Sequence, residues 1–192
     1  MPDNKGMILL PIARSAITET LGMSCEASED ATWLQEEAAC FITLMQKDNL
    51  RGCIGTLEAH RSLLEDVKHN ANAAAFHDSR FSPLTSEELD ITDIEISLLS
   101  PMQALQFSDE RNALTQLQPG TDGVVFECGH HRSTFLPQVW KQLPDTNDFI
   151  AHLKTKAGLS ADFWSDEVKL SRYTVNKWKE RDFMAPTEEQ SI

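Results

Sequence analysis

Two apolar runs separated by a short polar turn constrain the fold of this chain more than any other feature. The run "AACFITLMQ" at residues 38–46 is followed by "KDN" and then by "LRGCIGTL" at residues 50–57. Two strand-like runs joined in this way predict an antiparallel β-hairpin. Ser62 and Glu65 then have the spacing of a capping box, which predicts a helix from there to about His77.

Helices and strands are interspersed in the rest of the chain and do not follow strict βαβ order. We therefore predict an α+β fold with a mixed, largely antiparallel sheet, flanking helices, and a large and a small lobe. Residues 1–181 are expected to form one domain with a smaller lobe at about 62–120, and residues 182–192 a frayed tail. The patterns predict helices at 8–21, 108–120 (capped by Ser108) and 146–158, a strand at 91–100, a second hairpin at 122–137 and one long strand at 168–180.

Charge and cysteine content narrow the class of function. The formal net charge is −13, which disfavours a broad nucleic-acid or anionic-membrane surface because both require clustered Lys and Arg. No apolar run has the length of a transmembrane helix, and we interpret the apolar N-terminal stretch as a core helix and not as a signal peptide. The four cysteines contain no CxxC pair, so we expect reduced thiols and a cytoplasmic protein.

Five short motifs occur in one order along most of the chain. Together they resemble the AMMECR domain, also called AmmeMemoRadiSam system protein A. The resemblance implies a two-lobed α+β fold and possible Memo-type and radical-SAM partner proteins, and it implies no settled activity. The chain has no CxxxCxxC run, Gly-rich phosphate loop or HExxH motif, so we expect no cofactor. The motifs are "LRGCIGTL" (50–57), "DSRFSPL" (78–84), "IEISLLSP" (94–101), "GTDGVV" (120–125) and "STFLPQVW" (133–140).

Cys53 is the central candidate for chemistry and lies between Gly52 and Gly55 in the first motif. The glycines would let a substrate approach the backbone and the thiol, and the N-terminus of the helix near Ser62 would lower the pKa of that thiol. Cysteine is also among the most buried residue types, and glycines often serve packing, so both interpretations stay open. We expect Arg51 to alternate away from Cys53 and to reach it only through a β-bulge.

Three charged residues in the later motifs are further candidates. Asp78 and Arg80 follow the end of the predicted helix, which suits an arginine that reaches into a cleft while the carboxylate orients it. A structural ion pair that fixes the loop is the alternative. Glu95 is expected on the strand face opposite Ile94 and Ile96, either as a general base or ligand in a cleft or on a solvated face.

Two weaker signals lie in the second half of the chain. Cys128, His130 and His131 cluster at a predicted turn, but zinc requires about four ligands and adjacent strand residues point to opposite faces, so we expect no metal site. Gln138 is a candidate to place its amide in a cleft. Two functions follow: a cysteine-containing cleft that acts on a small anionic substrate together with Memo-type and radical-SAM proteins, or a non-catalytic adaptor that binds a ligand, peptide or protein.

Overall fold

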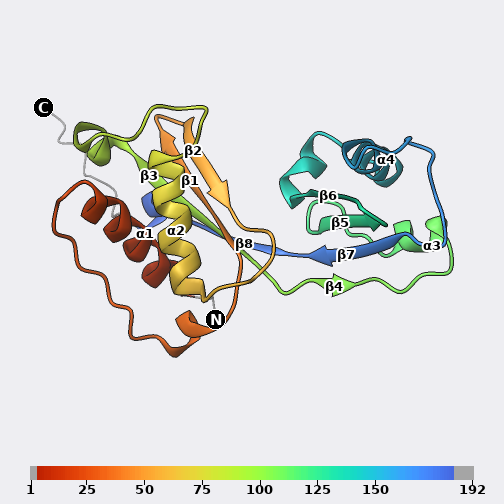
Figure 1. Cartoon of the computed structure of the whole chain (residues 1–192), viewed down its shortest axis with the longest axis horizontal. Helices are drawn as coiled ribbons and strands as arrows, with labels where there is room; N and C mark the ends of the chain where they lie inside the picture. The colour runs from red at the N-terminus through yellow and green to blue at the C-terminus, as the bar shows by residue number, and fades with distance from the viewer. Residues whose placement is uncertain (1–3, 184–192) are drawn as a thin grey trace, which may run out of the picture. The chain divides into compact units, whose positions relative to one another are not determined.

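The chain folds into two compact units, each with its own four-stranded sheet and helices (Figure 1). The computed structural model describes residues 4–183. Within that range the first unit comprises residues 4–99 and 176–183, and the second comprises residues 100–175. The mixture of helices with largely antiparallel strands confirms the predicted two-lobed α+β class.

The bounds of the units differ from the smaller lobe expected at residues 62–120. The helix that follows Ser62 belongs to the first unit, and the second unit begins at Ser100. The second unit is an insertion between two neighbouring strands of the first sheet, which local sequence patterns do not reveal. Of the expected tail, residues 184–192 lie outside the described part of the chain.

The first unit is a sheet of order β2-β1-β3-β8 with two helices on one face (Figure 1). α1 packs on α2 and β3, while α2 packs on β1 and β2. Its elements are α1 (Gly6–Thr20), η1 (Thr32–Gln35), β1 (Cys40–Gln46), β2 (Asn49–Gly55), α2 (Leu63–Phe76), η2 (Ser86–Ile91), β3 (Asp93–Leu99), β8 (Val175–Lys179) and η4 (Glu180–Asp182). Its core is formed by buried apolar side chains that include Leu9, Ile12, Ile17, Ile42, Leu44, Val67, Ala71, Ile94 and Ile96.

The predicted hairpin and the capped helix are both present. β1 and β2 are joined by a two-residue turn in which Lys47 and Asp48 have φ values of 48° and 65°. Positive φ at both positions is the geometry whose twist matches that of a two-stranded ribbon. At the start of α2, the Glu65 N–H donates to Ser62 Oγ at 3.3 Å and the Ser62 N–H donates to Glu65 Oε2 at 3.4 Å, which completes the capping box.

A β-bulge interrupts the hairpin at Arg51. Leu44 pairs with Gly52 and Met45 pairs with Leu50, so Arg51 has no partner residue on β1. The expectation that alternation alone turns Arg51 away from Cys53 is wrong, because residues two apart share a face of a regular strand. The bulge breaks that alternation.

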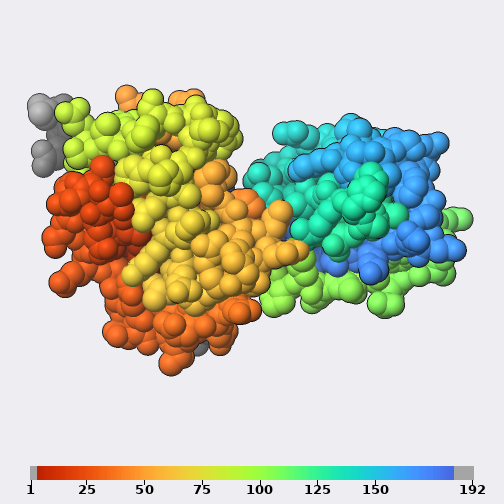
Figure 2. All heavy atoms as spheres, viewed as in Figure 1, coloured from red at the N-terminus to blue at the C-terminus, as the bar shows by residue number. Residues whose placement is uncertain are grey.

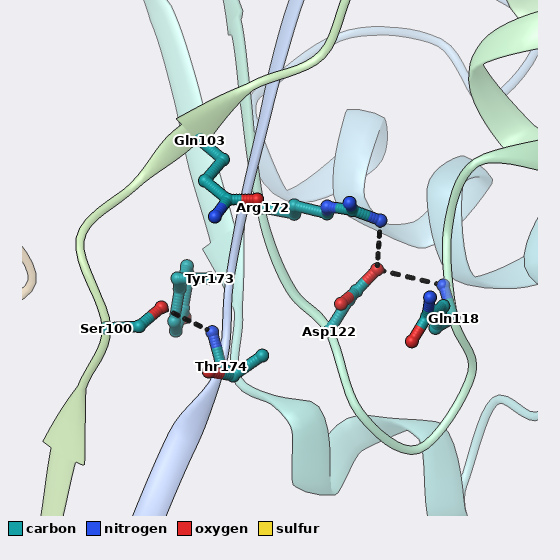
Figure 3. A pocket seen from close by; sticks show the side chains of 7 residues that line it. All are labelled: Ser100, Gln103, Gln118, Asp122, Arg172, Tyr173 and Thr174. Carbon is teal, nitrogen blue, oxygen red and sulfur yellow. Dashed lines mark hydrogen bonds and ion pairs between the residues drawn. The ribbon is translucent and has the colours of Figure 1, made fainter.

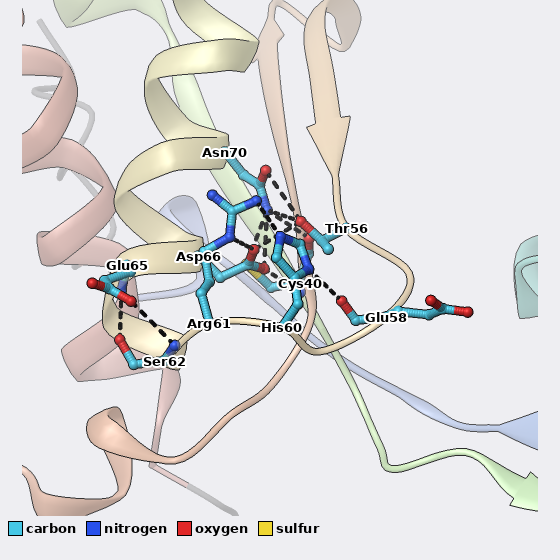
Figure 4. Close-up of polar contacts among 9 residues, drawn as sticks. All are labelled: Cys40, Thr56, Glu58, His60, Arg61, Ser62, Glu65, Asp66 and Asn70. Atoms are coloured by element: carbon cyan, nitrogen blue, oxygen red, sulfur yellow. Dashed lines mark hydrogen bonds and ion pairs between the residues drawn. The ribbon is translucent and has the colours of Figure 1, made fainter.

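A buried polar network joins α2 to both strands of the hairpin (Figure 4). The Asp66 side chain has no exposed surface, and it accepts hydrogen bonds from the Cys40 N–H at 2.9 Å and from Thr56 Oγ1 at 2.7 Å. Asn70 Nδ2 donates to Asp66 at 3.0 Å, and Arg61 Nε lies 3.2 Å from the same carboxylate as an ion pair. One carboxylate therefore holds together the start of β1, the end of β2 and the first turn of α2.

The second unit is an antiparallel sheet of order β4-β7-β5-β6 that carries α4 beside β6. The cap of its first helix is Asp109 and not the expected Ser108, because the Asp109 carboxylate accepts the Asn112 N–H at 2.8 Å. Its elements are β4 (Gln103–Ala104), α3 (Glu110–Thr115), β5 (Gly123–Cys128), β6 (His131–Phe135), η3 (Pro137–Lys141), α4 (Thr146–Lys156) and β7 (Lys169–Tyr173).

The long final strand expected at residues 168–180 is two strands in different sheets. β7 ends at Tyr173 in the second sheet, and β8 begins at Val175 in the first. Between them, the Thr174 N–H donates to Ser100 Oγ and the Thr174 carbonyl accepts the Ser100 N–H, both at 2.9 Å. The alternation of side chains continues through Thr174 although the neighbouring strand changes there. The sequence pattern therefore did not reveal the division into two strands.

We predict that Asp66→Ala lowers the free energy of unfolding by about 3–5 kcal/mol, because it leaves buried donors and the Arg61 charge without their acceptor. Glu65→Ala, at the exposed neighbouring position, removes one capping bond and should cost about 1 kcal/mol. Urea unfolding of both variants measures the difference. Equal losses would show that the buried network contributes no more than a surface cap.

Candidate functional site

Cys53 lies in a row of polar residues that crosses the first sheet on the face away from the helices. Thr43 on β1 is directly opposite Cys53 on β2 and directly opposite Glu95 on β3. The Thr43 hydroxyl and the Cys53 thiol are 3.3 Å apart and form a hydrogen bond. Because side chains alternate along a strand, the pattern that buries Ile42 and Ile94 against the helices places this row on the other face.

The main chain of Cys53 is held from outside the sheet by the Asp78–Arg80 pair. β2 is an edge strand, so its outward N–H and C=O groups lack a strand partner. The Cys53 N–H donates to Asp78 Oδ2 at 2.9 Å, and Arg80 Nη2 donates to the Cys53 carbonyl at 3.2 Å. Two side chains thus replace the missing strand at this residue, and the structure brings three of the four predicted catalytic candidates together.

The Asp78–Arg80 ion pair has short hydrogen bonds, and only its arginine is well exposed to solvent. Arg80 donates to Asp78 through Nε at 2.9 Å and through Nη2 at 2.6 Å. These bonds lead the effects that hold the pKa of Asp78 well below its usual range, in spite of burial. The Asp78 side chain is 4% exposed while that of Arg80 is 54% exposed. The guanidinium is therefore the part of the pair that a ligand can reach. The segment at residues 77–92 that carries the pair is yellow-green in Figure 2 and lies at the surface of the first unit.

Glu95 is buried beneath cations. Its side chain is 5% exposed, and it forms an ion pair with Lys177, a second with Lys179 at 3.2 Å and a third with Arg181 at 3.6 Å. Burial acts to raise the pKa of Glu95, but Lys177 and Lys179 lower it overall below its usual value. A carboxylate in this state is a poor proton acceptor at neutral pH, and its evident effect is to anchor the cations above it.

Arg51 binds a carboxylate away from Cys53. Its guanidinium donates to Glu88 Oε1 and Oε2, both at 3.0 Å, and to the Ser82 carbonyl at 2.9 Å. The bond from Arg51 leads the effects that lower the pKa of Glu88 to about 2. The pair ties the bulged residue of β2 to η2, and it leaves Arg80 as the arginine that is bonded to the main chain of Cys53.

The two motif glycines are explained by packing. A Cβ on Gly52 would lie 2.2 Å from the carbonyl oxygen of Ala74 on α2, and one on Gly55 would lie 2.2 Å from the ring of Phe41. The space beside each glycine is therefore already filled by the protein. Close approach of a substrate to these backbone positions is not needed to account for them.

The four thiols differ in accessibility. Cys40 and Cys128 are buried, whereas Cys25 and Cys53 are half-buried. Burial, followed by the charge of Asp66, raises the pKa of the Cys40 thiol well above its ordinary value, which makes it inert. Cys25 and Cys53 remain as the accessible thiols.

The candidates from the second half of the chain belong to the second unit. Gln138 is exposed on η3 in the second unit, and Cys53 is in the first. His131 Nδ1 is bonded to the Ala157 carbonyl at 2.9 Å, and the Cys128 sulfur lies 3.6 Å from Ser165 Oγ. Within residues 4–183, no group of three or more His, Cys, Asp or Glu side chains is placed to hold a metal ion. None of the helices in this range has the length and hydrophobicity of a transmembrane span.

Sequence reasoning missed the residues that complete the row around Cys53. Thr43 gave no local signal, because its role depends on the hairpin register. The signal for the cations was present in "NKWKER", where Lys177, Lys179 and Arg181 recur at every second position. That spacing places Lys177 and Lys179 on one face of β8, with Arg181 just beyond the strand in η4. Only the strand pairing shows that this face also carries Glu95.

Replacing Glu88 should change the acid sensitivity of the protein. Its pKa of about 2 lies below the usual 4.3 of an unfolded chain, so its contribution to stability is present above about pH 5 and is lost as the pH falls toward 2. We expect Glu88→Gln to lower the free energy of unfolding by about 3 kcal/mol at neutral pH, with the gap to wild type closing on acidification. Urea unfolding from pH 7 to 2, with exposed Glu87→Gln as control, measures it. A gap independent of pH would contradict this assignment.

Comparison with known proteins agrees with the motifs. The AMMECR1 family model matches residues 10–178. Protein MJ0810 of Methanocaldococcus jannaschii is 37% identical over 149 residues, which cover 76% of this chain and 74% of that protein. A protein of Methanothermobacter thermautotrophicus is 34% identical over 182 residues, which cover 92% of this chain and 95% of that protein. The crystal structure of uncharacterized protein PH0010 from Pyrococcus horikoshii superposes with a TM-score of 0.77 at 31% identity over 93% of each chain. The chain therefore belongs to the AMMECR1 family.

Proposed function

We propose that the face of the first sheet around Cys53 is a thiol site that acts on a small anionic substrate. The observation that carries the proposal is the position of Arg80, a half-exposed guanidinium bonded to the carbonyl of a half-buried cysteine. A guanidinium is permanently charged and matches carboxylate and phosphate groups. A nearby positive charge also favours the thiolate, which is the reactive form of cysteine.

Each residue of the row, and the Asp78–Arg80 pair beside it, has a distinct role in this proposal. Cys53 is the nucleophile, and Thr43 orients its sulfur through their hydrogen bond. Arg80 binds the anionic group of the substrate, while Asp78 and the main chain of Cys53 keep the guanidinium beside the thiol. Glu95 is a positioning residue that holds Lys177 and Lys179 over the same face.

The charge relations of Arg80 support this arrangement. Its pKa is raised chiefly by the hydrogen bond with Asp78, and the negative charge of a Cys53 thiolate contributes in the same direction. Such an effect on Arg80 requires the two groups to be close enough to interact through space. An anionic substrate would therefore meet the guanidinium and the sulfur together.

The resemblance to AmmeMemoRadiSam proteins supports the identity of the partners. We include in the proposal that a Memo-type and a radical-SAM protein work with this chain, and that one of them supplies the anionic substrate. The described residues themselves carry neither a metal-ligand cluster nor the cluster-binding run of a radical-SAM protein.

A non-catalytic binding module is the second candidate, and the packing of the motif favours it. The space beside Gly52 and Gly55 is filled by other residues of the protein. The Asp78–Arg80 pair provides hydrogen-bond partners for the main-chain N–H and carbonyl of Cys53 without a ligand. Under this alternative, Cys53 is a small strand residue and its thiol has no reaction. The two candidates differ in how the thiol responds to an anionic reagent.

Paired alkylation distinguishes them. Iodoacetate and iodoacetamide react by the same displacement of iodide by a thiolate, but only iodoacetate is an anion. We expect the ratio of the two rates, followed by mass spectrometry of peptides, to be several-fold higher at Cys53 than at Cys25, because Arg80 attracts the anionic reagent. Arg80→Gln should reduce the ratio at Cys53 to that at Cys25, and Arg80→Lys should retain part of it.

The control removes a charge elsewhere in the first unit. Lys68 on α2 is a half-exposed cation paired with Glu29, and Lys68→Gln should leave the ratio at Cys53 unchanged. If wild-type Cys53 and Cys25 show the same ratio, or if Lys68→Gln and Arg80→Gln have equal effects, the thiol site is rejected and the binding module is retained.

A further inference from the structure

A pocket lies within the second unit and includes a motif that the thiol site does not use. Its volume is about 200 Å³. Asp122 belongs to the "GTDGVV" motif and borders the pocket, and Arg172 from β7 reaches across toward it (Figure 3). The residues that line the pocket are Ser100, Gln103, Gln118, Asp122, Arg172, Tyr173 and Thr174.

Asp122 is a buried carboxylate that the protein only partly satisfies. The residue is 2% exposed, and its Oδ2 accepts the Gln118 N–H at 2.9 Å. Arg172 Nη1 lies 3.7 Å from the same oxygen, which is an ion-pair distance without a close hydrogen bond. No donor within residues 4–183 is bonded to Oδ1. Oδ1 is therefore open to the pocket, where the donor of a ligand can complete its hydrogen bonds.

Arg172 also keeps unused donors. Its Nη1 donates to the Gln116 carbonyl at 2.9 Å, whereas its Nε and Nη2 have no acceptor in the described part of the chain. The side chain is 30% exposed. A guanidinium with free N–H groups on one edge is suited to a carboxylate, which it can bind with two parallel hydrogen bonds.

Two carboxamides complete the polar lining. Gln103 on β4 is directly opposite Arg172 in the strand pairing, and Gln118 is adjacent to the Asp122 carboxylate. Both glutamines are exposed, and neither side-chain amide is bonded to another described residue. An amide offers both donors and acceptors, so it tolerates polar groups of either kind on a ligand.

We propose that this pocket binds a free α-amino acid. The ammonium donates to Asp122 Oδ1, the carboxylate pairs with the free edge of Arg172, and Gln103 and Gln118 contact the rest of the molecule. A negative and a positive group that lie 3.7 Å apart on the protein favour a ligand whose two opposite charges are just as close together. An α-amino acid carries its ammonium and carboxylate on one carbon and meets this requirement.

Other small ligands fit the pocket less well. A simple anion would be attracted by Arg172 but repelled by Asp122, and a simple cation would meet the reverse. A nucleotide is too large, because a volume of about 200 Å³ lies below the usual size of pockets that take drug-sized ligands. The pocket is therefore matched to a small zwitterion.

Titration calorimetry tests the proposal with the full chain. The twenty standard L-amino acids are first compared by the rise in melting temperature, and the strongest is titrated beside two analogues, one lacking the ammonium and one lacking the carboxylate. We expect at least one amino acid to bind and each analogue to bind about tenfold more weakly or worse, because each analogue loses one of the two charge pairs with the protein. Absence of binding by all twenty, or equal binding of an analogue, overturns the proposal.

Variants locate the binding. Arg172→Gln should weaken it about tenfold or more, and Gln103→Ala should weaken it less. Gln106→Ala is the matched control, since Gln106 is exposed on the same segment outside the pocket. Because Gln103 is exposed, Gln103→Ala should fold normally, and its effect on binding can be measured even if Arg172→Gln does not fold. Binding that neither variant weakens places the ligand elsewhere and overturns the proposal. Cys53→Ser should leave amino-acid binding unchanged, whatever the outcome of the alkylation experiment.

Discussion

Two buried carboxylates, one near each end of α2, fix this helix to the first sheet. Asp66 in the first turn accepts the N–H of Cys40, and Asp78 just beyond the helix accepts the N–H of Cys53, both at 2.9 Å. Each N–H would otherwise lack a partner, and an unpaired main-chain donor is costly when buried. The position of α2, the placement of β1 and β2, and the exposure of the Cys53 thiol thus depend on one set of bonds.

The same constraint divides the sheet into a packing face and a polar face. Gly52 points to α2, where Ala74 leaves no space for a side chain, so the helix can approach the sheet closely. Cys53, one residue later, points the other way. In the motif "RGCIG", Gly52 is therefore explained by close packing against α2, and Cys53 lies on the polar face of the sheet. The packing interpretation of its glycines is supported by these contacts, and a reactive Cys53 stays a prediction.

The sequence predicted what local signals determine and missed what distant pairing determines. The hairpin and the start of α2 follow from the turn and the capping box, which act within a few residues. The partnership of Asp78 with Arg80 was also predicted, since the two are close in the chain. The junction at Thr174 and the cations over Glu95 depend on which strands become neighbours. Alternation within a single strand carries no information about its neighbour.

The strongly acidic composition does not oppose an anion site in this chain. Electrostatic interactions between exposed charges are screened over about 8 Å at physiological ionic strength, so the nearest groups dominate. On the polar face of the first sheet these are Arg80, Lys177 and Lys179, and the carboxylates among them, Asp78 and Glu95, are buried and already paired. The exposed part of each ion pair is its cation. A net charge of −13 therefore coexists with exposed cations on this face, because burial hides the carboxylates Asp78 and Glu95 that pair with them.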